Sequence, residues 1–303
     1  MNEQLRNANL KMPTHPVDVV LDTDAYNEID DQFAICYLLA CEEKLHTQAF
    51  YAAPFSNKKE PNVKRGMEES HREIGDLLKM MGKSKPVFRG SDRYLENEAT
   101  PVDSDAARDL AARARNYSPE NPLYVIAIGA ITNIASAILL EPKVVENTVV
   151  IWLGGHAHHF HDTVEFNMKQ DVAAARVVMG SGVPFIQLPC NGVVSSFTLS
   201  EPELDRHFVG KSKLTDYLAS ATKAYVEERY PGMPWAKPIW DVTAVAWLMN
   251  ENNRYMFDRT EKCRLPGYDN IYEEANGLDI GYVYHIRRNE LMDDMIRRIC
   301  SLG

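Results

Sequence analysis

The stretch VDVVLDTDAYNEIDD, residues 17–31, contains the strand-to-helix transition that decides the fold. Its first six residues are rich in valine and lie between a proline and a run of acidic residues, which predicts a buried strand over 17–22. The segment from Ile29 to about Cys41 then has the apolar spacing of a helix. A buried strand that leads into a helix is the unit from which parallel α/β sheets are built.

The same alternation of apolar strands and helices continues along most of the chain. Further strands are predicted over residues 47–53, 86–90, 123–129, 148–155 and 184–188. Further helices are predicted over residues 63–81, 105–117, 132–140, 171–180, 213–229, 241–249 and from about 289 onward. This order predicts an α/β fold with a doubly wound, mainly parallel sheet and helices on both faces. No repeat or Gly/Ser-rich linker interrupts the pattern, so residues 1–303 are expected to form a single domain.

The composition excludes several classes of function. With 33 Lys and Arg against 43 Asp and Glu, the chain has a formal net charge of −10 and no general attraction for nucleic acid or anionic membranes. The N-terminus lacks the apolar stretch of a secretory signal, and the longest apolar region, 124–140, is interrupted and short for a membrane span, so we expect a cytoplasmic protein. The five scattered cysteines form no CxxC pair, which favours buried reduced thiols.

Five carboxylates lie within ten residues where the first strand leads into the first helix: Asp22, Asp24, Glu28, Asp30 and Asp31. A helix N-terminus favours acidic residues, which accounts for Asp30 and Asp31 but poorly for Asp22 and Asp24 after an apolar strand. Because like charges repel, a bound divalent cation would offset them. Ligation by oxygen alone favours Ca²⁺ or Mg²⁺, and a Ca²⁺ site takes about 6–8 oxygens, so other strand ends must contribute.

Four patterns occur in order along residues 17 to 250. The aspartates of residues 22–31 follow DxDxGxDD, with two additional residues between the second and third. GAITNIASAILLEP at 129–142 follows G-x-x-TN-x-A, and IWDVTAVAWL at 239–248 follows HDPxAVAYL. The pattern MGG…AEFN is matched by WLGG at 152–155 and EFN at 165–167. A D-P-E-A-A helix is matched by QDVAAARVV at 170–178. Together these segments resemble the inosine-uridine-preferring nucleoside hydrolase family, whereas the last 50 residues contain no motif that we can place.

The resemblance implies a nucleoside-hydrolase fold with Ca²⁺ at the carboxyl-terminal edge of the sheet. The implied metal ligands are Asp24, Asp31, Asp241 and the backbone carbonyl of Ile128. Asp24 is also the implied general base for the attacking water. The residues implied to hold the ribose hydroxyls are Asp30, Asn57, Glu165 and Asn167. Family members form homodimers or homotetramers, which the resemblance implies here as well.

The chemistry of N-glycosidic cleavage needs these residue types. The reaction passes through an oxocarbenium-like sugar, which requires nearby negative charge, a water nucleophile and an activated leaving group. A bound cation lowers the pKa of water, and an adjacent carboxylate removes its proton. Carboxylates and amides around the sugar bind its vicinal hydroxyls and fix its orientation.

Two further features leave alternatives open. GGHAHHFHDT, residues 154–163, carries four histidines, which either form a polar loop, line the active site or bind a transition metal. By alignment, His159 stands where the family has an asparagine that contacts the 5′ end of ribose. Trp240 stands where many members have histidine and where purine-specific members have tryptophan. It either packs in the core or offers a face on which a nucleobase stacks.

We therefore expect a Ca²⁺-dependent hydrolase that cleaves ribonucleosides, favouring purines, to ribose and free base. Two alternatives stay close to this one: hydrolysis of another riboside or glycosyl compound, and a nucleoside- or sugar-binding relative without turnover. A third is a haloacid-dehalogenase-type phosphatase, whose DxDx[TV] motif is matched incompletely because Tyr26 stands at its fifth position. The expected partner is a small-molecule nucleoside or riboside, with neither nucleic acid nor membrane.

Overall fold

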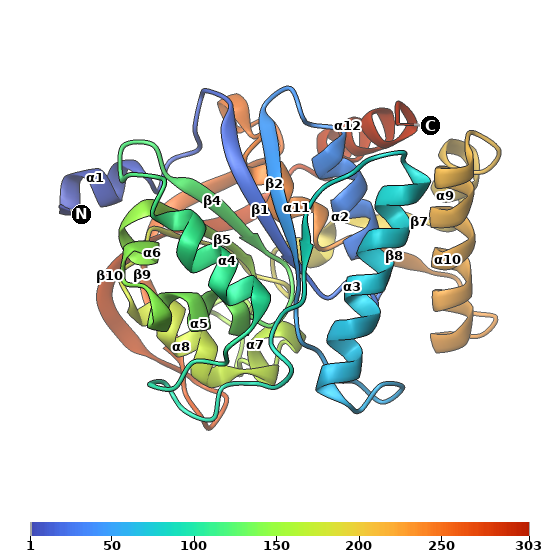
Figure 1. Cartoon of the computed structure of the whole chain (residues 1–303). Coiled ribbons are helices and arrows are strands. Elements are labelled where there is room, and N and C mark those ends of the chain that lie inside the picture. Colours follow the sequence, from blue (N-terminus) through green and yellow to red (C-terminus); the bar gives the residue numbers. More distant parts are fainter. Residues whose placement is uncertain (1, 303) are drawn as a thin grey trace.

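The strand β1 (Val17–Thr23) lies inside an eight-stranded sheet of order β3-β2-β1-β4-β5-β6-β10-β9 (Figure 1). The computed structural model describes residues 2–302. Neighbouring strands pair in parallel from β3 to β10, and β9 pairs antiparallel with β10. The other strands of this sheet are β2 (Leu45–Ala52), β3 (Val87–Phe88), β4 (Leu123–Ala127), β5 (Thr148–Leu153), β6 (Phe185–Leu188), β9 (Met256–Pro266) and β10 (Tyr272–Ile286). A separate antiparallel pair consists of β7 (Thr198–Ser200) and β8 (Ala236–Pro238).

Helices cover both faces of the sheet, and β1 contributes to the core on each side. Val19 and Leu21 pack into one core and Val20 into the other, because successive side chains of a strand point to opposite faces. The helices with residues in the first core are α2 (Asp30–Leu39), α3 (Val63–Met80), α9 (Glu201–His207), α10 (Lys213–Arg229), α11 (Val242–Trp247) and α12 (Arg288–Cys300). Those in the second are α4 (Asp105–Ala114), α5 (Thr132–Leu140), α6 (Lys143–Asn147), α7 (Phe166–Gln170) and α8 (Val172–Gly180), while α1 (Glu3–Ala8) begins the chain.

The predicted α/β fold with a mainly parallel sheet and helices on both faces is confirmed, and so are most of its elements. Each predicted strand up to residue 188 is present, with bounds that differ by a few residues. The predicted helix 105–117 ends earlier, at Ala114, where the backbone turns. Each cysteine is free, and four are buried as predicted, whereas Cys300 is half-buried. No helix within residues 2–302 is long and apolar enough to cross a membrane.

The C-terminal hairpin of β9 and β10 is the largest element that the sequence did not predict. β9 has the sequence MFDRTEKCRLP, and most of its side chains are exposed or half-buried. It lies at the edge of the sheet, where charged residues are tolerated and protect the edge from pairing with other chains. A charged edge strand lacks the apolar run by which the other strands were recognised.

A buried hydrogen bond from Tyr37 to Asp294 attaches α12 to α2, the helix that carries two residues of the acidic cluster. The Asp294 carboxylate accepts a hydrogen bond from the Tyr37 hydroxyl at 2.7 Å and another from Arg298 Nε at 2.9 Å. Burial alone would raise the pKa of Asp294, but the Tyr37 hydroxyl and the Arg298 charge outweigh it, so the pKa lies below its ordinary value. The charged carboxylate therefore stabilises the contact between the two helices.

This contact predicts a pH-dependent loss of stability in the Asp294→Asn variant. A depressed pKa in the folded state stabilises the protein above the unfolded pKa of about 3.9, and the contribution disappears as pH falls through the folded value. We expect the free energy of unfolding in urea to fall by about 2 kcal/mol at pH 7 and by less near pH 3.5. Asp293→Asn, at an exposed position of the same helix, is the control. An equal deficit at both pH values would contradict the assignment.

Candidate functional site

A cavity of about 280 Å³ lies beyond the carboxyl ends of β1, β4, β5 and β6. This is the edge at which doubly wound sheets bind their ligands. Eight of the ten residues that the sequence resemblance assigns to the site line it: Asp24, Asp30, Asp31, Ile128, Glu165, Asn167, Trp240 and Asp241. The structure does not bring the other two, Asn57 and His159, to the cavity wall.

The carboxylates come from three elements whose ends meet at the cavity. Asp24 directly follows β1, Asp30 and Asp31 begin α2, and Asp241 precedes α11. Carboxylate oxygens of Asp30, Asp31 and Asp241 lie within 4.8 Å of one another. Each of the four side chains is at least 96% buried, and Asp24 Oδ2 has no hydrogen-bond partner among the residues described.

Burial and mutual repulsion raise the pKa of these acids. Loss of water around the side chain is the larger cause for Asp31, and the nearby Asp30 charge adds to it, which raises the pKa of Asp31 to about 8. The same two causes raise the pKa of Asp24 and of Asp241 well above the usual value. A bound cation would stabilise the charged form of these carboxylates and so lower their pKa values. Because the donors are carboxylates and a nearby carbonyl, the residues fit a hard divalent ion such as Ca²⁺ or Mg²⁺.

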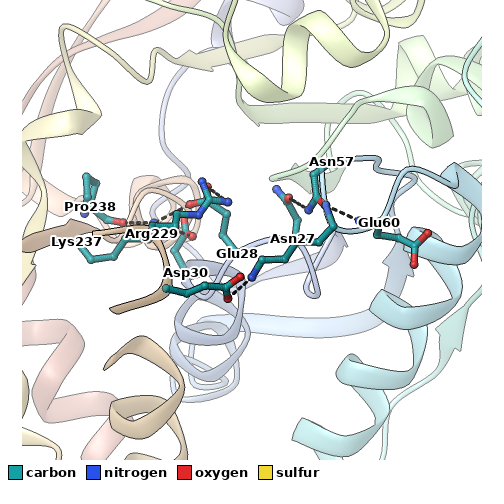
Figure 2. Close-up of polar contacts among 10 residues, drawn as sticks. Asn27, Glu28, Asp30, Asn57, Glu60, Arg229, Lys237 and Pro238 are labelled. Atoms are coloured by element: carbon teal, nitrogen blue, oxygen red, sulfur yellow. Dashed lines mark hydrogen bonds and ion pairs between the residues drawn. The ribbon is translucent and has the colours of Figure 1, made fainter. Parts of the chain in front are cut away.

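Lys237 of β8 supplies a positive charge to one side of the cluster (Figure 2). Its ammonium group is buried and donates to Glu28 Oε2 at 2.8 Å, to Asp30 Oδ1 at 3.2 Å and to the Pro238 carbonyl at 2.8 Å. Asp30 is therefore already paired with a cation, unlike Asp24. The sequence did not indicate this lysine, because 207 residues separate it from Asp30.

Asp22, the first residue of the DxD pattern, lies behind the cavity and not in its wall. Its Oδ1 accepts a hydrogen bond from Asn133 Nδ2 at 2.7 Å, and Asn133 Oδ1 in turn accepts from the backbone N–H of Ser91. Burial raises the pKa of Asp22 to about 7, although the hydrogen bond from Asn133 opposes the increase. The asparagine of the TN motif thus holds the end of β1 in place.

Glu165 and Asn167 also line the cavity and are held by backbone groups. Glu165 caps α7 and accepts hydrogen bonds from the backbone N–H groups of Gly155, Asn167 and Met168, each at 2.9 Å. Asn167 Nδ2 donates to the carbonyl of Ile128 at 3.1 Å. A carbonyl oxygen has two lone pairs, so this contact orients the Ile128 oxygen and leaves it able to bind a cation.

In the histidine-rich loop, His156 lies at the cavity and His159 does not. The backbone N–H of Phe160 bonds to the Ala157 carbonyl at 2.8 Å, and this tight turn leaves His159 exposed. His156 is buried at the cavity wall, and its Nδ1 has no hydrogen-bond partner within residues 2–302. His158 packs between the rings of Tyr272 and Tyr282. The group of possible metal ligands found within residues 2–302 consists of three aspartates and includes none of these histidines.

Trp240 stands between the first cavity and a second one of about 400 Å³. Trp240 and Glu28 line both cavities, and the second is also lined by Tyr225, Arg229 and Trp235. Trp240 is half-buried, unlike Trp152 and Trp247, which are fully buried. An indole face is therefore available at the point where the two cavities meet.

Comparison with known proteins identifies a family whose sequence pattern this chain matches. The model of the family "Inosine-uridine preferring nucleoside hydrolase" matches residues 19–267. The non-specific ribonucleoside hydrolase RihC of Salmonella paratyphi B is 24% identical over 253 residues, which cover 78% of this chain and 79% of that protein.

Two solved structures have the same fold. The plant nucleoside hydrolase PpNRh1 superimposes with a TM-score of 0.74 at 19% identity, covering 94% of this chain and 99% of the other. The purine-preferring ribonucleoside hydrolase of Gardnerella vaginalis gives 0.74 at 17% identity, covering 94% and 98%. The family match includes every one of the cavity-lining residues described above. The chain therefore belongs to the inosine-uridine preferring nucleoside hydrolase family and is an N-glycosyl hydrolase of ribonucleosides.

Proposed function

We propose that this enzyme depends on Ca²⁺ and prefers purine ribonucleosides. The observation that supports the metal is the buried group of Asp30, Asp31 and Asp241 carboxylates at a cavity. Asp24 lines the same cavity, and its Oδ2 has no hydrogen-bond partner in the described chain. The observation that supports purines is the half-buried Trp240 at the same cavity, because an indole stacks on a two-ring base over a large area.

We assign the metal to Asp24, Asp31, Asp241 and the Ile128 carbonyl. The close group of carboxylates consists of Asp30, Asp31 and Asp241 and does not include Asp24, but the Lys237 ammonium bonds to Asp30. A divalent cation at the same oxygens would lie next to that ammonium and be repelled by it. Asp30 is thus better suited to accept a hydrogen bond from a sugar hydroxyl, and Asp24 to ligate the ion.

Different residues of the chain have different roles in the hydrolysis. When bound, Ca²⁺ supplies positive charge that orients and acidifies a water molecule. Asp24 accepts the proton of the attacking water, and the remaining carboxylates stabilise the positive charge that develops on the sugar. Asp30, Glu165 and Asn167 hold the sugar hydroxyls, so that the anomeric carbon stays within reach of the water.

Departure of the base needs a further contribution, because no histidine stands at position 240. The face of Trp240 stabilises a protonated purine by a cation–π interaction of ~0.5–2 kcal/mol. This corresponds to at most about 30-fold in rate, so a proton from solvent or from His156, the one histidine of its loop that lines the cavity, completes the activation.

A nucleoside panel tests the function. We expect Ca²⁺-supported release of ribose from inosine and guanosine, and a loss of at least about 100-fold in kcat when the general base is removed in Asp24→Asn. Asp22→Asn, a change in the same motif but outside the cavity, is the control and should stay within a few-fold of wild type. Tight nucleoside binding without ribose release would instead identify a binding protein. Ribose release only from other ribosides would show that the enzyme acts on a different class of substrate.

Calcium should also stabilise the folded protein. Binding at 100 times the dissociation constant adds about 2.7 kcal/mol, which raises the Tm of a chain of this length by about 4 °C. Differential scanning calorimetry from chelator to millimolar Ca²⁺ measures this shift, and Asp241→Asn should reduce it strongly. An unchanged Tm across the titration would exclude the metal site.

Replacement of Trp240 distinguishes stacking from core packing. If the indole activates the purine, Trp240→Ala lowers kcat for inosine by about 10- to 30-fold and affects p-nitrophenyl riboside, which has a good leaving group, much less. Steady-state kinetics on both substrates give the comparison. Equal losses on the two would show that Trp240 serves packing or the geometry of Asp241.

A further inference from the structure

The loop between β1 and α2, residues 24–29, is held on both sides (Figure 2). It contains the two residues by which this chain exceeds the spacing of the DxDxGxDD pattern. On one side Lys237 bonds to Glu28, and on the other Asn57 Nδ2 donates to Asn27 Oδ1 at 3.0 Å. Through these contacts the loop brings Asn27 and Glu28 to the cavity wall.

The hydrogen bonds of Asn57 fix which way round its amide lies. Asn57 Oδ1 accepts the backbone N–H groups of Lys59 and Glu60, both at 2.8 Å. The nitrogen of the same amide must then be the atom that faces Asn27. The side chain of Asn57 is committed to the protein and lies outside the cavity wall.

The orientation of Asn57 in turn sets that of Asn27. Because Asn57 presents a donor, Asn27 must present its oxygen to it, and the Asn27 NH₂ group is left with two N–H donors. The Asn27 backbone N–H bonds to the carbonyl of Asp24 at 2.8 Å, so the residue is held in a turn beside the acidic cluster. The loop thus adds a hydrogen-bond donor to the wall, on the same loop that leads into Asp30 and Asp31.

We propose that Asn27 contacts the substrate and donates a hydrogen bond to a hydroxyl oxygen of the sugar, and that Asn57 is its positioning residue. This inference rests on the proposed function. A sugar hydroxyl that donates its proton to a carboxylate such as Asp30 still has lone pairs, which need a donor once water is excluded. Asn27 supplies that donor from the same loop, and it contacts the sugar where the sequence resemblance placed Asn57.

The first test compares Asn27→Ala with wild type on inosine and on its 2′-, 3′- and 5′-deoxy analogues, as substrates and as competitive inhibitors. We expect kcat/KM for inosine to fall about 10-fold, since one hydrogen bond is lost. For the one analogue that lacks the contacted hydroxyl, the variant and wild type should differ by less than about 2-fold. A mere packing role would lower activity on the whole series equally.

The second test reverses the orientation of the Asn27 amide and leaves the shape of the side chain at position 57 unchanged. Asn57→Asp keeps the acceptors for Lys59 and Glu60 but removes the donor, so Asn27 must turn its NH₂ toward the new carboxylate and its oxygen toward the cavity. We expect the same hydroxyl-specific loss of about 10-fold. Combined with Asn27→Ala it should add little further loss, because both changes remove one interaction.

Asn62→Ala is the matched control, since Asn62 caps α3 in the same segment but does not contact Asn27. It should leave the substrate series unchanged. A uniform loss across the analogues, or full activity in Asn27→Ala and Asn57→Asp, would overturn the assignment of Asn27 while the hydrolase function stands. Absence of ribose release by the wild-type enzyme from any nucleoside would instead remove the proposed function itself.

Discussion

The burial of like charges is the constraint on which the rest of this structure depends. Four aspartates lie almost completely out of water at one edge of the sheet, and isolated carboxylates in such surroundings would take up protons instead of staying charged. The protein offsets part of this charge with Lys237 and leaves Asp24, Asp31 and Asp241 facing the cavity. A cation that enters there stabilises the fold and completes the active site by the same contacts.

The scaffold keeps these charges in place through hydrogen bonds between buried side chains and the elements that end at the cavity. The start of α2 carries two of the aspartates, and its other end is attached to α12 by Tyr37 and Asp294. Asn133 binds Asp22 at the end of β1, and Asn167 binds the Ile128 carbonyl at the end of β4. Each of these partners is an uncharged or paired group that would have little reason to be buried except to hold a neighbour.

The sequence predicted what depends on short spacing and failed where distant segments meet. Asp24 and Asp31 could be placed at the cavity because strand, loop and helix are contiguous, and Asp241 because it stands in a motif. Lys237 could not, since no local pattern relates it to Asp30. The two additional loop residues were noticed, but only the hydrogen bonds of Asn57 show that they bring Asn27 to the wall. Likewise, only the turn at Ala157 shows that His156 lines the cavity and that His159 does not.

Lys237 also gives one side of the acidic cluster a counter-charge that no chelator can remove. A metal ion can be diluted or chelated, whereas an ammonium group joined to the backbone of β8 cannot leave. Glu28 and Asp30 therefore keep their counter-charge whatever the metal content of the solution. The attachment of the β1–α2 loop to β8 is made by folding alone, so this side of the pocket has a permanent partner for its charge.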